Sequence, residues 1–589
     1  MRGLPRSSWR RLGTLTVAAL AFATVSGAAA AQAGTGGARA HVIVLVDGAD
    51  TAAVEQQVRS TGGTLGRRLG LVHGFTAEMP VAALPVLAAR PSVRSVTPDV
   101  SGHLLSVDPA LGYDPGSDEG SLAWIAGMLN VRSAWAGGYT GRGVDVALID
   151  SGVARVPGLT SGNVVDGPDL SFESQAADVR YRDTYGHGTH MASILAGRDS
   201  AGTPASYLTT TKFTGIAPDA RLVSLKVAAA DGSADVSQVI AAIDWVTQHA
   251  HDYGLNIRVL NLSYGTDSTQ GSGLDPLSYA VEQAWRHGIV VVAAAGNDGT
   301  TRQELADPAS NPYVLSVGAD DPNGTVTVQD DVVAAFAQRG TVARPVDVIA
   351  PGVHVLGLRV PNGYIDQNNP AGRVGTRFIR GSGTSQATAL TSGVAALLLQ
   401  RFPAATPDQV KYLITRSATK LPQVSTGSQA GQNNDLWQGF GVIDAARALA
   451  GTPSAAPVQS FPAATGRGTL EGARGSSHVA LSGLKLAGER DIFDHAWNAA
   501  AWAAAAAAGT CWSGGTFNGS VWTGSGWAQP TAWAAGTWTG VDWTGTSWSS
   551  RTWVSRTWVD SSWDSRTWVD STWTSRTWVA TAWADASWS

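Results

Sequence analysis

The chain has 589 residues, 44% of them hydrophobic and 15% charged, with a formal net charge of −5. This much apolar material excludes a wholly disordered chain, and the length favours several domains. The chain has no excess of basic residues, so neither nucleic acid nor an anionic membrane surface is indicated as a partner. The single cysteine, Cys511, excludes an internal disulfide framework. Tryptophan is the unusual residue, because 17 of the 23 lie between Trp497 and Trp588.

Residues 1–33 have the pattern of an export signal. Arg2, Arg6, Arg10 and Arg11 precede a short apolar stretch and the small-residue cleavage pattern Ala31-Gln32-Ala33. The apolar stretch is well short of the roughly 20 residues that a membrane-spanning helix needs. We therefore expect a secreted protein with no membrane span.

Residues 38–105 predict a small α+β domain with a ferredoxin-like βαββαβ order. His41–Val46, Phe75–Met79 and Val93–Val96 favour strands, a further short strand is expected within Gly63–Val72, and Ala52–Ser60 and Val81–Ala89 favour helices. Residues 106–120, rich in Asp, Gly and Pro, are expected to form an exposed and cleavable linker.

Residues 121–452 predict an α/β domain with a parallel sheet flanked by helices on both faces, because continuous apolar strands alternate with helical segments. In such sheets, ligands bind beyond the carboxyl ends of the strands, so catalytic residues should directly follow strands. The expected helices are His187–Ala196, Val236–Ala250, Leu277–His287 and Ser385–Arg401. The expected strands are Val144–Ile149, Leu222–Val227, Val259–Leu262, Ile289–Ala294, Val314–Val317 and Val346–Ile349.

A second linker is expected at residues 453–480 and a Trp-rich, β-rich repeat tail at 481–589. From Trp533 to Trp588 a tryptophan recurs every five residues, with Thr, Val and Ser between. One hypothesis is a repetitive hairpin or solenoid that binds cell-wall glycans or another surface. The alternatives are a self-packed stalk without a ligand and a disordered, aggregation-prone appendage.

Three segments carry the parts of an acyl-transfer site. Asp150 ends an apolar strand, His187 lies in Gly186-His187-Gly188-Thr189-His190 at the start of a helix, and Ser385 follows a Gly/Ser turn at another helix N-terminus. A helix N-terminus favours developing negative charge. Asn297, after a fourth apolar strand, could donate its amide to an oxyanion.

In the order Asp, His, Asn, Ser, these segments resemble the subtilisin-like serine peptidase family, over roughly Trp124 to Leu449. The resemblance implies that Asp150 orients the base, His187 is the general base, Ser385 is the nucleophile and Asn297 is an oxyanion donor. It also implies a substrate groove whose two backbone edges pair with an extended peptide. These edges are Ser263, Tyr264 and Gly265 on one side and Ala294, Ala295 and Gly296 on the other.

The same resemblance implies that residues 38–105 are an inhibitory prosegment, removed by a cut between His103 and Ser121. The chain departs from the family pattern at Gln386, where Met is usual, and at Ala389, where Pro is usual.

No metal motif is found and no cofactor is expected to be required, although the resemblance makes a structural Ca²⁺ compatible with this chain. Asp320-Asp321 and Asp330-Asp331 are expected to be solvated turns rather than a calcium site, and His190 is expected to pack inside its helix. The predicted function is a secreted serine endopeptidase that acts on polypeptides. The rival hypothesis is a non-hydrolytic surface or assembly protein that binds through the same scaffold and the Trp-rich tail.

Overall fold

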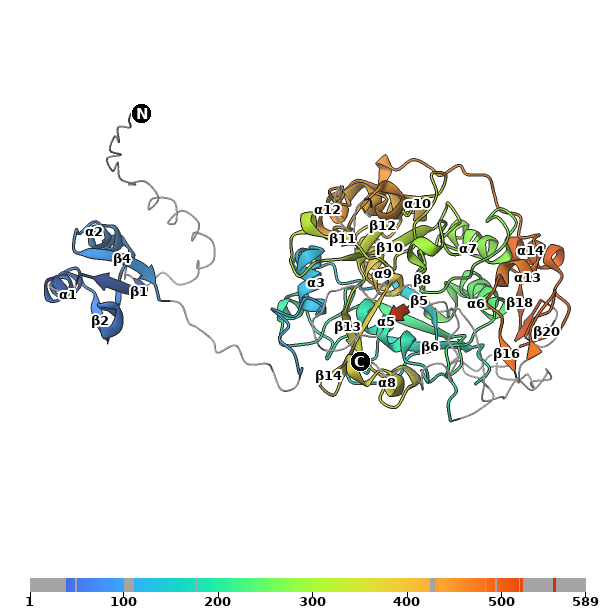
Figure 1. The fold of residues 1–589 in the computed structure, drawn as a ribbon, viewed down its shortest axis with the longest axis horizontal. Helices are drawn as coiled ribbons and strands as arrows, with labels where there is room; N and C mark the ends of the chain where they lie inside the picture. Colours follow the sequence, from blue (N-terminus) through green and yellow to red (C-terminus); the bar gives the residue numbers. More distant parts are fainter. Residues whose placement is uncertain are drawn as a thin grey trace, which may run out of the picture. The chain divides into compact units, whose positions relative to one another are not determined.

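The structure, a computed structural model, describes residues 39–47, 50–99, 111–174, 178–423, 431, 433–481, 484–492, 495–518, 520–522 and 555–557. The predicted signal and most of the predicted repeat tail lie outside the described residues. The chain divides into two compact units, Met1–Leu105 and Ser106–Ser589. Both are drawn in Figure 1, and each is described by itself.

The first unit has the expected βαββαβ order. Its elements are β1 (Arg39–Val46), α1 (Thr51–Ser60), β2 (Thr64–Leu69), β3 (Gly74–Pro80), α2 (Leu84–Ala88) and β4 (Val93–Pro98). The strands form one sheet in the order β2-β3-β1-β4, and the pairs of β1 with β3 and β4 are antiparallel. Alternate residues of β1, Val42, Val44 and Val46, face a core that also contains Phe75 and Met79.

The second unit contains the predicted parallel sheet. Its strand order is β11-β10-β9-β8-β5-β7-β6, with β12 paired to β10. All of these strand pairs are parallel except the pair of β11 with β10. The strands are β5 (Asp145–Asp150), β6 (Val164–Asp169), β7 (Arg221–Lys226), β8 (Ile257–Leu262), β9 (Val290–Ala294), β10 (Leu315–Asp321), β11 (Val332–Val333) and β12 (Val348–Pro351).

Helices cover both faces of this sheet. On one face, α5 (His187–Ala196) and α9 (Thr384–Arg401) pack against each other, and on the other face α6 (Val236–His249) packs against α7 (Pro276–Arg286). Local signals fix where these helices begin. Asp235 forms a capping box at α6, and Asp275 accepts hydrogen bonds from Leu277 N and Ser278 N at α7.

A second, smaller sheet leads the chain into α9. It has the order β13-β15-β14, formed by β13 (Val355–Leu358), β14 (Arg373–Val374) and β15 (Phe378–Gly383). The remaining helices of the domain are α3 (Leu122–Met128), α4 (Val131–Ala136), α8 (Tyr364–Asn368), α10 (Pro407–Ser417), α11 (Asp435–Gln438) and α12 (Ala445–Ala450).

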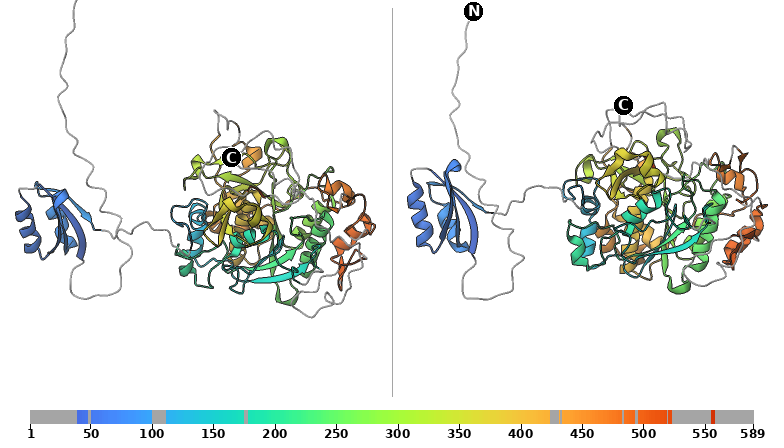
Figure 2. Two further views of the ribbon diagram at one scale, coloured as in Figure 1. Left: turned by 60° about the horizontal axis from the view of Figure 1, so that its bottom comes forward. Right: turned by 90° about the horizontal axis from the view of Figure 1, so that it is seen from below.

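We call the described part of residues 453–522 the C-terminal extension (Figures 1 and 2); its first residues, 453–455, contact α10, and its later elements lie against the outer side of α6 and α7. It begins within the expected linker, which contains α13 (Leu470–Arg474). The later elements are β16 (Ala480–Leu481), β17 (Leu484–Lys485), α14 (Ala499–Ala508), β18 (Trp512–Ser513), β19 (Thr516–Phe517) and β20 (Ser520–Val521).

The extension is held by a buried aromatic cluster and by polar contacts. Trp502 is fully buried and donates from Nε1 to Asp244 Oδ2 at 2.7 Å, and Trp512 donates from Nε1 to Ala241 O at 2.9 Å. Arg474 and Asp235 form an ion pair at 2.6 Å in which both side chains are 0% exposed. The extension is therefore part of the packed interior of the second unit.

Among the residues that the structure describes, no helix is both long enough and apolar enough to cross a lipid bilayer.

Candidate functional site

The site forms at the carboxyl end of β5, where the predicted acid meets the predicted base. Asp150 is the last residue of β5 and is fully buried. His187 Nδ1 lies 2.8 Å from Asp150 Oδ1 and 2.9 Å from Oδ2. A carboxylate at this position favours the tautomer with the proton on Nδ1, which makes Nε2 the proton acceptor of the ring.

A second buried carboxylate, Asp183, fixes the start of α5 and was not predicted from the sequence. Its Oδ1 accepts from Gly186 N at 2.6 Å and from Ser151 Oγ at 2.8 Å, and its Oδ2 accepts from Thr189 N at 2.7 Å. Burial raises the pKa of Asp183, against the opposing effect of these hydrogen bonds. An Asp shortly before a helix start was the available signal, since such residues satisfy the first N–H groups.

Gly188 is required because the helix lies directly on the turn that follows Asp150. A Cβ at this position would meet Gly152 O at 2.2 Å and Asp150 Oδ1 at 3.1 Å. A glycine beside the predicted base could also serve to let a substrate approach closely. For Gly188 the close neighbour is the protein's own backbone, so the reason for that glycine is internal packing.

Ser385 lies in the first turn of α9, where the main-chain N–H groups are not used by the helix itself. Its Oγ donates to Ser263 O at 3.5 Å, and Ser263 Oγ donates to Ser385 O at 3.3 Å. The helix α5, which begins at His187, packs against α9, which begins at Thr384.

Asn297 is oriented by Thr384, the residue before Ser385. Asn297 Oδ1 accepts from Thr384 N and from Thr384 Oγ1, both at 3.0 Å. These two bonds fix which end of the amide faces Thr384, so Nδ2 points away from it. The preceding turn is also fixed, because Gly296 has φ +113° and a Cβ there would meet Gln338 Oε1 at 2.0 Å.

The two predicted groove segments follow neighbouring parallel strands. Ser263, Tyr264 and Gly265 come after β8, and the segment from Ala294 to Gly296 comes at the end of β9. Ala295 uses its N–H for Val317 O and its C=O for Ala306 N, both at 2.9 Å. The main-chain N–H of Ala295 is therefore already used within the domain, and the pairing of both segments with a peptide stays a prediction.

His190 and two residues of the acidic pairs, Asp320 and Asp331, are buried. His190 is fully buried near Ile379 O, and burial lowers its pKa to about 3, with a further lowering from His187, so the ring is neutral. The expectation of solvated turns is wrong for Asp320 and Asp331, which are 0% and 1% exposed. Burial raises the pKa of both, that of Asp331 to about 7.

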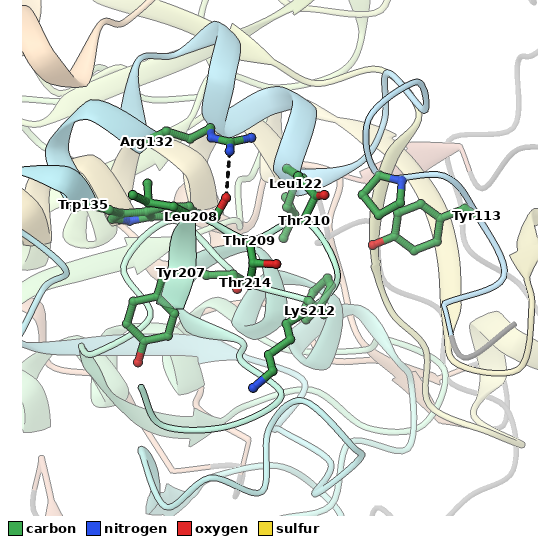
Figure 3. Close-up of a pocket in the computed structure, with 13 residues that line it drawn as sticks. Tyr113, Leu122, Arg132, Trp135, Tyr207, Leu208, Thr209, Thr210, Lys212 and Thr214 are labelled. Atoms are coloured by element: carbon green, nitrogen blue, oxygen red, sulfur yellow. Dashed lines mark hydrogen bonds between the residues drawn. The ribbon is translucent and has the colours of Figure 1, made fainter. Parts of the chain in front are cut away.

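Within the described part of the chain, no group of three or more His, Cys, Asp or Glu side chains is placed to hold a metal ion such as Ca²⁺. A hollow bordered by Trp135, Tyr207 and Lys212 also lies outside the site (Figure 3). There, Arg132 donates to Leu208 O at 2.7 Å, and none of the predicted catalytic residues borders the hollow.

Comparisons with known proteins identify the family of this domain. The model of the subtilase family matches residues 141–441, and the chain belongs to that family of subtilisin-like serine proteases. Serine protease AprX of Bacillus subtilis (strain 168) is 38% identical over 288 residues, 48% of this chain and 62% of AprX. Subtilisin DY of Bacillus licheniformis is 34% identical over 297 residues, 50% of this chain and 90% of that protein.

Among solved structures, fervidolysin from Fervidobacterium pennivorans, a keratinolytic enzyme related to subtilisin, is 24% identical with a TM-score of 0.44. That match covers 72% of this chain and 62% of fervidolysin. The chain thus spans somewhat under two thirds of the length of AprX and of fervidolysin.

Proposed function

We propose that this protein is a secreted serine endopeptidase that hydrolyses peptide bonds with Asp150, His187 and Ser385 and with an oxyanion donor at Asn297. The observation that carries the proposal is the contact of His187 Nδ1 with both carboxylate oxygens of Asp150, at 2.8 and 2.9 Å, in a domain whose family uses this chemistry. The amide of Asn297, oriented by Thr384, supplies the proposed oxyanion donor.

In the first half of the reaction, His187 Nε2 takes the proton of Ser385 Oγ as that oxygen attacks the carbonyl carbon of the substrate. The negative charge that forms on the carbonyl oxygen is stabilised by Asn297 Nδ2 and by the Ser385 N–H at the start of α9. His187 then gives the proton to the leaving amine. A water molecule then attacks the acyl-enzyme with the same proton transfers, and the carboxylic acid product is released.

Polypeptide is the proposed substrate, held in extended form along Ser263, Tyr264 and Gly265 and walled by the segment from Ala294 to Gly296. Main-chain pairing of this kind accepts many sequences, so we expect broad specificity. The unit at residues 38–105 is proposed to be an intramolecular inhibitor that leaves after a cut between His103 and Ser121. No cofactor enters the proposed mechanism.

The test compares the wild type with Ser385→Ala and His187→Ala, using release of the first unit and hydrolysis of casein as readouts. Both variants should lose about 10⁶-fold in kcat, the loss that follows removal of one member of such a unit, as known for subtilisin itself. Ser133→Ala, at an exposed position of α4, is the matched control. A wild type that folds but neither processes itself nor cleaves casein would favour the non-hydrolytic surface protein instead.

A further inference from the structure

One short strand from the Trp-rich region lies beside the proposed nucleophile. β21 (Ser555–Thr557) pairs antiparallel with the end of β15, with Ser382 opposite Thr557 and Gly383 opposite Ser555. β21 also packs against α9. In Figure 1 it is the short red strand in the middle of the second unit, far in sequence from the elements around it.

The end of β15 leads directly to the proposed catalytic groups. Gly383 is two residues before Ser385, and Thr384 orients Asn297. The end of β15 is also fixed by the domain, since Gly383 N donates to Gly352 O at 2.8 Å and His354 N donates to Ser382 Oγ at 2.9 Å. β21 therefore pairs with a preformed strand end next to the groups that are proposed to perform the chemistry.

We infer that the segment Ser555–Thr557 is an internal ligand of the cleft, which competes with polypeptide substrate by adding a strand to β15. An extended substrate with its scissile bond at Ser385 must run past the residues next to Ser385, and β21 lies along two of them. Strand addition uses main-chain hydrogen bonds. The inference rests on the proposed function, and it assigns the C-terminal repeat an autoinhibitory role in addition to that of the first unit.

The sequence supports this role through repetition. Ser-Arg-Thr-Trp-Val begins at Ser550, Ser555, Ser565 and Ser575. A covalently attached ligand acts at high effective concentration, and several identical copies raise it further. We therefore expect inhibition that is reversible, raises KM for large substrates and leaves kcat unchanged.

A disulfide lock tests the placement in the full chain. Residues directly opposite each other in an antiparallel pair have Cα atoms about 4.5–5.5 Å apart, which suits a disulfide. Ser382→Cys combined with Thr557→Cys should form an intrachain bond under mild oxidation, detected by peptide mass mapping. Ser382→Cys with Thr572→Cys is the matched control, because Thr572 also precedes a Trp but lies in an Asp-Ser-Thr unit, and it should cross-link much less.

The oxidised Ser382→Cys/Thr557→Cys protein should lose casein hydrolysis at least about 10-fold, and a thiol reductant should restore it, since a covalent tether holds the ligand in place. Equal cross-linking of both cysteine pairs, or a cross-linked protein that keeps its activity, would overturn the inference. Failure of the proposed function looks different, because the reduced protein would then be inactive as well, while the yield of the 382–557 disulfide would still report on docking.

A second measurement needs no cysteine. Replacing the Thr of all four Ser-Arg-Thr units by Pro removes a main-chain donor in each and should lower KM for casein. The same four positions changed to Val keep the N–H and the strand preference and should leave KM at the wild-type value. An unchanged KM in the Pro variant would contradict the competition.

Discussion

Two of the regions of the second unit that bury carboxylates give them different partners. At the start of α5, Asp150 contacts His187, a group that can change its protonation state, and Asp183 accepts main-chain N–H groups. On the outer side of α6, Asp235 contacts the permanent cation of Arg474 and Asp244 contacts the indole of Trp502. A buried acid therefore does not by itself mark a reactive site. The partner decides whether the acid orients chemistry or fixes packing.

The largest effect is expected where the extension would lose its buried cation. Arg474→Ala leaves Asp235 buried without its partner and should lower the free energy of unfolding by about 3–5 kcal/mol. Chemical denaturation measures this, with Arg467→Ala, an exposed residue of the same extension, as control. If Arg474→Ala changed stability no more than the control, the extension could not be an integral part of the unit.

At the reactive region, Asn297→Ala should lower kcat by about 10²–10³-fold with little change in KM, which is the range for one oxyanion donor, that of subtilisin included. Steady-state kinetics with a chromogenic peptide measures this effect. Asn368→Ala, at an exposed position of α8, should retain wild-type kinetics. A rise in KM alone would assign Asn297 to substrate binding instead.

Asp183→Asn tests whether the second acid positions His187. One carboxylate oxygen becomes an NH₂ group facing the N–H of Gly186 or Thr189, so the first turn of α5 should shift. We expect kcat to fall about 10-fold or more because misplaced catalytic groups are costly, and stability to fall by about 1–3 kcal/mol. Kinetics well below the unfolding temperature separates the two effects. Asp252→Asn, an exposed residue, is the control.

The smallest effect is a pH dependence at the extension. Burial raises the pKa of Asp244 from 3.8 to about 7. Between these values the folded protein keeps a proton that the unfolded chain has released, so the free energy of unfolding falls as pH rises, by up to about 1.4 kcal/mol per pH unit. Asp244→Asn keeps an oxygen for Trp502 and should lose this slope. Thermal unfolding of both proteins at pH 5 and pH 8 measures the difference, and identical slopes would contradict the assignment.

Strongly patterned segments were predictable from the sequence. The apolar strands β5, β7, β8 and β9 and the helix α5 were expected within one or two residues of where they lie. The strand β6 was missed because its sequence Val-Val-Asp-Gly-Pro-Asp is half polar and contains Pro168, which is tolerated because β6 is the last strand in the sheet order.

The extension shows the limit of local patterns. Residues 453–480 have the composition of a linker, but Leu470 and Arg474 are buried against the domain. The spacing of five between Trp497 and Trp502, and between Trp512, Phe517 and Trp522, matches neither a helix nor a strand period. These aromatic residues are all buried. They pack against one another, and α14 and β18, which carry Trp502 and Trp512, pack against α7 and α6.

By itself, the sequence determined the class of domain and the identity of the candidate groups, because strand and helix periods and the order Asp, His, Asn, Ser are local or linear properties. Only the tertiary structure decided which groups touch. Asp183 joins the site through hydrogen bonds to Ser151 and Gly186, Gly188 is a glycine because Gly152 lies against it, and β21 lies beside β15 across more than 170 residues of chain. Such contacts depend on how elements far apart in the sequence pack, and the spacing of residues along the chain does not reveal them.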